Sequence, residues 1–211
     1  EVYSYLCAMV IATTAVAFLV LGLGLAFCGY RFVRASHQST GSKNNKIGFL
    51  LSIFLFTFAL HSGVMGFGIL LFGDQPVYFH FIVIISSILL TFIGLFGVRM
   101  VYYIFYPRNS PYMAMTLTGI LGTILAVMAI VMKSQSFVTS YGGFDFNFDP
   151  LYSITLFGML FVDIGAQGYI FTRIFLDEKL NKEVRLLSLI MSGLAATGIS
   201  NTFIRFVVAN Y

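Results

Sequence analysis

The chain has 211 residues, of which 59% are hydrophobic and only 9% are charged, and its mean hydropathy is +0.93. A soluble domain carries about 25% charged residues, so this composition excludes an ordinary soluble fold and makes lipid the solvent for most of the surface. The formal charge is +4, and its basic residues gather in short segments between apolar runs, which favours phospholipid head groups over nucleic acid as their partner.

The first apolar run covers residues 3–30. It is longer than the apolar core of a signal peptide and has no obvious small-residue cleavage site, so we expect a retained helix. Cys7 and Cys28 lie near its opposite ends, about 30 Å apart at 1.5 Å per residue. That separation is too large for a disulfide between them.

Five further apolar runs follow, and each of the six is long enough to cross a hydrocarbon core of about 30 Å. They cover residues 47–72, 77–106, 112–132, 151–176 and 184–208. Turn signals at Gly73–Pro76 and Tyr106–Pro111 separate two pairs of runs, and Pro150 marks the start of the fifth helix. The sequence therefore predicts an all-α fold, a polytopic transmembrane bundle of about six helices in one domain over residues 1–211.

Loop charges predict the orientation of this bundle. The first, third and fifth connections and the adjoining helix ends hold most of the basic residues, which the positive-inside rule places in the cytoplasm. Both ends of the numbered chain then lie on the non-cytoplasmic side. The basic residues on the predicted cytoplasmic side are Arg31, Arg34, Lys43, Lys46, Arg99, Arg108, Arg173, Lys179, Lys182 and Arg185.

The longest outer connection, Lys133–Pro150, alternates aromatic and polar residues over Tyr141–Phe148. This alternation indicates an amphipathic flap or a short hairpin at the membrane interface. It is typical of an aromatic belt in the head-group layer, and it also fits a docking surface for a partner or ligand. We expect the connection to lie against the outer face of the bundle, held by its Phe and Tyr side chains.

Catalytic signatures are missing from the sequence: it has no Gly-rich phosphate loop, nucleophile elbow, HExxH motif or metal-ligand spacing. His37 falls in an expected loop, and His61 and His80 fall on different helices at different depths, so bis-histidine haem ligation is unsupported. The sequence predicts no catalytic residue and no metal site, identifies no cofactor, and favours a protein that is not an enzyme.

Asp163 is the most informative single residue, because it falls near the middle of the helix at 151–176. An unpaired charge at that depth costs at least about 2.5–3.5 kcal/mol, so we expect the side chain to face the bundle interior. Gln167 lies four residues further on, on the same helix face. His61, near the middle of the second helix, is the best partner at similar depth, and the pair could be structural or could relay protons or a cation.

Small residues mark faces where helices can approach closely. Gly158, Gly165 and Thr172 recur at seven-residue spacing on the face opposite Asp163, so we expect a second helix to pack there. Gly94 and Gly97 mark another such face in the third helix. Several faces of this kind favour a compact bundle and contacts with other membrane subunits.

Thr197, Asn201 and Arg205 recur at four-residue spacing in the sixth helix and form a polar lane toward the outer surface. The lane could hold neighbouring helices together while Arg205 reaches the head groups. It could also form the wall of an outward-opening cavity or contact an anion.

Two functions remain open. The first is a non-enzymatic multi-pass module that acts through helix packing, as a subunit of a membrane complex or as the sensory region of a receptor. Its expected partners are the lipid bilayer and other membrane subunits or further copies of the chain, and not nucleic acid. The second is a small ion or solute channel or transporter, with His61, Asp163 and Gln167 along the route. Against it, few polar residues are available to line a pathway.

Overall fold

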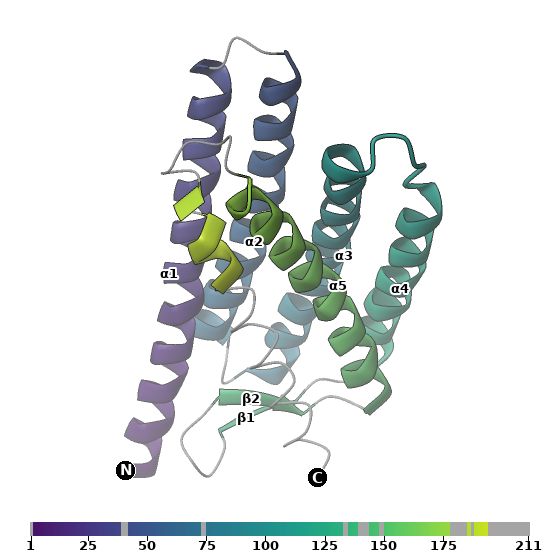
Figure 1. Cartoon of the computed structure of the whole chain (residues 1–211). Coiled ribbons are helices and arrows are strands. Elements are labelled where there is room, and N and C mark those ends of the chain that lie inside the picture. The colour runs from purple at the N-terminus through teal and green to yellow at the C-terminus, as the bar shows by residue number, and fades with distance from the viewer. Residues whose placement is uncertain are drawn as a thin grey trace.

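The computed structural model describes residues 2–38, 42–72, 75–132, 135–138, 144–147, 150–177, 185–186 and 188–193. Within these residues, five helices are long and apolar enough to span a membrane (Figure 1). Helices suit that setting because they satisfy every backbone polar group internally, which hydrocarbon cannot do. The expected helical bundle is confirmed for five of its six spans, and the orientation of the chain stays a prediction.

The first two helices are longer than the sequence indicated. α1 runs from Val2 to Gln38 and α2 from Ser42 to Phe72, so the expected connection around residues 31–46 is mostly helical and His37 belongs to a helix. The expected helix ends at residues 30 and 47 were therefore wrong. A drop in hydropathy marks where a helix leaves the hydrocarbon, whereas Lys and Arg are good helix formers that allow the helix to continue.

The next three helices match the predicted ranges to within a residue at each end. They are α3 (Pro76–Phe105), α4 (Tyr112–Val131) and α5 (Pro150–Phe175). A proline stands at or just before the first residue of each, where its missing N–H costs no helical hydrogen bond.

A small hairpin lies between α4 and α5. Strand β1 (Gln135–Val138) pairs antiparallel with β2 (Phe144–Asn147), with Gln135 opposite Asn147. The backbone of β1 approaches α3 and that of β2 approaches α1, at the end of the bundle where α1 begins (Figure 1). The predicted hairpin against the bundle is therefore confirmed for the backbone, and the role of its aromatic side chains stays a prediction.

The helices pack as neighbours in chain order, and α5 adds a second contact. α1 packs on α2, α2 on α3, and α3 on α4, while α5 contacts both α4 and α3. α5 starts beside α4 and crosses α3 obliquely (Figure 1). This crossing decides which residues of α3 lie at the depth of the middle of α5.

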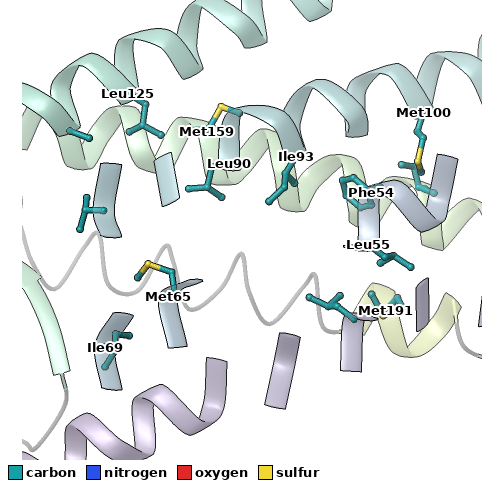
Figure 2. Packing of buried hydrophobic residues seen from close by; sticks show 14 of the residues in the cluster. Phe54, Leu55, Met65, Ile69, Leu90, Ile93, Met100, Leu125, Met159 and Met191 are labelled. Atoms are coloured by element: carbon teal, nitrogen blue, oxygen red, sulfur yellow. The ribbon is translucent and has the colours of Figure 1, made fainter. Parts of the chain in front are cut away.

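Apolar side chains from all five helices form one core. Figure 2 shows part of it, with Phe54 and Leu55 from α2, Ile93 from α3, Leu125 from α4 and Met159 from α5. Met191 also joins this core. It belongs to the described part of the sixth predicted helix, in which residues 185–186 and 188–193 are helical.

Candidate functional site

Asp163 is fully buried, with 0% of its surface exposed. The prediction that it faces the bundle interior is confirmed. Across the contact with α3 it lies beside Gly94: a Cβ atom placed on Gly94 would lie 2.6 Å from Asp163 Oδ1 and 2.9 Å from the Thr118 methyl of α4, and would also clash with the Met159 methyl. The carboxyl group therefore sits at the junction of α3, α4 and α5, where the missing side chain of Gly94 makes room for it.

Neither carboxyl oxygen of Asp163 has a hydrogen-bond partner among the described residues. Thr118, whose methyl lies beside the same Gly94 position, donates to the Ala114 carbonyl of its own helix at 2.9 Å. Gln167 is also buried, at 5% exposure, but it does not donate to Asp163. Ser62 and Ser188 also lack partners among the described residues, but a buried carboxylate without a donor is far more costly than a buried hydroxyl group.

His61 is buried at a different contact. Its Nε2 atom lies 2.8 Å from Ser86 Oγ of α3, whereas its Nδ1 atom has no partner among the described residues. The imidazole also lies beside the Phe58 ring, with a centroid distance of 6.0 Å. His61 thus joins α2 to α3 through one hydrogen bond.

His61 and Asp163 do not bond to each other, although the sequence offered them as a pair. Ser86 marks the level of His61 on α3, and Gly94 marks the level of Asp163. These two positions are eight residues apart, about 12 Å along the helix axis. The oblique crossing of α5 produces this offset, which residue positions within separate helices do not reveal.

Other buried polar groups join helices in pairs, and the sequence analysis did not identify them. Ser87 Oγ of α3 lies 2.9 Å from the Tyr152 hydroxyl of α5. Thr155 of α5 donates to the Leu151 carbonyl of its own helix at 2.9 Å, and its hydroxyl lies 3.6 Å from the Met128 sulfur of α4. Ser86 and Ser87 form an adjacent serine pair in an otherwise apolar run. That pair is the signal that could have revealed these contacts, because small hydroxyl side chains often bond between membrane helices.

The small-residue face opposite Asp163 is only partly covered. A Cβ atom on Gly158 would lie 3.8 Å from Leu121 of α4, and Thr172 donates to Ser192 of the 188–193 helical segment at 3.2 Å. At Gly165, by contrast, no described atom lies within 4 Å of such a Cβ. α5 instead lies close to α3 at Gly94 and at Gly97, whose Cβ would lie 3.3 Å from Ala166 Cβ.

The predicted polar lane of Thr197, Asn201 and Arg205 lies outside the described residues. Within the described part of the chain, no three His, Cys, Asp or Glu side chains come together in a way that could hold a metal ion.

Comparisons with protein-family models, with curated proteins and with solved structures gave no match for this chain.

Proposed function

We propose that this protein is a non-enzymatic integral membrane module that acts through helix packing, as a subunit of a membrane complex or as the membrane-embedded sensory region of a receptor. The observation that carries the proposal is how the buried polar groups are used. His61 bonds to Ser86 and Ser87 bonds to Tyr152, so each of these contacts joins one helix to one neighbour.

Several other bonds of buried hydroxyl groups also favour packing over transport, although Ser62 and Ser188 have no partner among the described residues. Ser52 donates to the Gly48 carbonyl, Thr118 to that of Ala114, and Ser87 to that of Val83, each within its own helix. Apolar side chains of the common core lie among these groups. A water-filled route needs polar groups that line it continuously, whereas these groups are engaged with their own helix or with a single neighbour.

The proposal is tested by extracting the protein from its native membrane in mild detergent and identifying what remains bound by native mass spectrometry. A membrane protein present in a fixed ratio to this chain is the expected result. In parallel, purified protein in liposomes is assayed for proton, sodium and potassium flux against empty liposomes. A lone oligomer that conducts ions would overturn the packing proposal.

A channel or transporter is the second candidate, and Asp163 is the observation that favours it. Its two carboxyl oxygens have no partner among the described residues, and charged groups inside membranes commonly mark ion or proton routes. In that case Asp163→Asn abolishes flux in liposomes while the variant keeps its helical circular dichroism. Equal flux for the variant and the parent protein would remove Asp163 from the route.

A further inference from the structure

We propose that Asp163 is a proton-binding site at the junction of α3, α4 and α5, where it holds the proton as a neutral carboxylic acid. This goes beyond the packing function, because it assigns a ligand to one contact of the bundle. The geometry carries the inference: the side chain is 0% exposed, and neither oxygen has a partner among the described residues. A group that is buried and unpartnered calls for either a donor or a bound proton.

The surroundings of Asp163 supply no counter-charge in the described structure. α3 presents Gly94, and its nearest charged residue in sequence, Arg99, is exposed. α4 presents the Thr118 methyl and has no charged residue between Tyr112 and Val131. The only titratable side chain of α4 is Tyr112, which is 76% exposed at the helix end.

α5 itself and the adjacent α2–α3 contact offer no counter-charge either. On α5, Tyr152, Tyr169 and Arg173 lie at least six residues from Asp163 in sequence. The His61 imidazole is bonded to Ser86 instead.

The same surroundings favour a proton over a metal cation. A hard cation in a protein takes six or more oxygen ligands, or keeps part of its water shell. The atoms that crowd the Gly94 position together with Asp163 Oδ1 are the methyls of Met159 and Thr118, and the Thr118 hydroxyl is committed to Ala114. A proton needs neither ligands nor space beyond the carboxyl group itself.

Proton binding would tie the α3–α5 contact to the protonation state of one residue. An ionised Asp163 requires water, a donor or a separated contact, because hydrocarbon and packed methyl groups do not solvate a charge. The proton-loaded acid is compatible with the packed junction, and the packed junction in turn keeps water from the acid.

Infrared spectroscopy tests the proposal directly. The protein in lipid nanodiscs at neutral pH should show the carbonyl stretch of a protonated carboxylic acid, and Asp163→Asn should lose that band. Asp177→Asn is the matched control: Asp177 is exposed just beyond the end of α5, outside the buried junction, so its replacement should leave the band unchanged. Absence of the acid band from the parent protein at neutral pH would overturn the proposal.

A second measurement needs no variant and so does not depend on whether Asp163→Asn folds. Aspartate labelled with ¹³C at the side-chain carboxyl should shift the acid band of the parent protein to lower frequency. Among the spans of the described residues, Asp163 is the only aspartate, so the shifted band is assigned to it. An acid band that does not shift comes from another residue type and contradicts the assignment. Because neither readout involves a partner or an ion flux, failure here is separate from failure of the proposed function.

Discussion

The α2–α3 and α3–α5 contacts each bury a titratable side chain near the middle of a spanning helix, and they treat it in opposite ways. At the first, His61 meets a hydroxyl group, Ser86, at 2.8 Å. At the second, Asp163 meets a glycine and two methyl groups, and its oxygens have no partner among the described residues. The first contact uses a polar residue to hold two helices together. The second keeps a carboxyl group inside the bundle although its burial without a partner costs free energy.

Burial of a polar residue therefore does not by itself indicate the role of that residue. A hydrogen bond between membrane helices contributes about 0.6 kcal/mol on average. Burial of a charged group costs several times more. The α2–α3 contact is therefore explained by stability alone. The α3–α5 contact is not, which is why we assign it a bound proton.

The largest expected effect tests whether α3 and α5 meet as described. In a background without Cys7 and Cys28, Gly97→Cys combined with Ala166→Cys should form a disulfide almost completely under mild oxidation. The built Cβ of Gly97 lies 3.3 Å from Ala166 Cβ, close to the 3.5–4.5 Å of native disulfides. The measurement is a gel in which two fragments, cut at a protease site inserted between β1 and β2, stay joined until reduced.

The matched control for this cross-link replaces Ala166→Cys by Gly165→Cys. No described atom lies within 4 Å of a Cβ at Gly165, so this pair should stay open. Stronger cross-linking through Gly165 than through Ala166 would mean that α5 presents a different face to α3, and the placement of Asp163 would be wrong.

The next effect concerns the room that Gly94 leaves for Asp163. Gly94→Ala should destabilise the protein by about 1–3 kcal/mol, the usual cost of overpacking, because its Cβ would lie 2.6 Å from Asp163 Oδ1 and 2.9 Å from the Thr118 methyl. Unfolding in mixed detergent, followed by circular dichroism, measures the change. Gly24→Ala is the control: no described atom lies within 4 Å of its Cβ, so no loss is expected. Equal stability of the two variants would contradict the tight junction.

The sequence predicted the positions of the five spans that the structure describes, because hydropathy over about 20 residues reports passage through the hydrocarbon directly. It also placed Asp163 inside, since the cost of exposing a charge to lipid is large enough to outweigh alternatives. It misplaced the C-terminal end of α1 and the N-terminal end of α2. A helix can continue after it leaves the hydrocarbon when it contains good helix formers such as Arg34 and Lys43.

The neighbours of Asp163 were beyond sequence reasoning for a geometric reason. Small-residue faces occur on several helices. Whether a neighbouring helix packs closely at Gly94 of α3 or at Gly165 of α5 depends on how the helices cross. The oblique path of α5 brings Asp163 to the level of Gly94, away from Ser86 and His61. Crossing angles come from the fit of all side chains at once, with tendencies too broad to derive from one helix at a time.

A smaller expected effect is the energetic coupling of His61 to Ser86, compared with its coupling to Asp163. A double-mutant cycle with His61→Ala and Ser86→Ala should give a coupling free energy of about 0.6 kcal/mol, and at most about 1.7 kcal/mol. A cycle with His61→Ala and Asp163→Asn should give no coupling beyond about 0.5 kcal/mol, because the two residues share no bond. The free energies of unfolding come from the same detergent titration. A larger coupling for the second cycle would restore the His61–Asp163 pair.

The smallest expected effect concerns two tyrosines of α5. The hydroxyl group of one bonds to α3, and that of the other bonds to the residue that follows α3. Tyr152 is buried and lies 2.9 Å from Ser87 Oγ, whereas Tyr169 is exposed and lies 2.9 Å from the Tyr106 hydroxyl. Tyr152→Phe should cost less than about 1 kcal/mol, because Ser87 keeps its own bond to the Val83 carbonyl.

Tyr169→Phe should change stability by no more than about 0.5 kcal/mol, since exposed hydroxyl groups can bond to water or lipid head groups instead. Its ring keeps the edge contact with Phe105, at a centroid distance of 5.3 Å. The two variants remove the same atom from the same residue type, so their difference in unfolding free energy isolates burial. If Tyr169→Phe proved the more damaging change, burial would not set the strength of these bonds, and the exposed Tyr106–Tyr169 contact would contribute more to stability than the buried Ser87–Tyr152 contact.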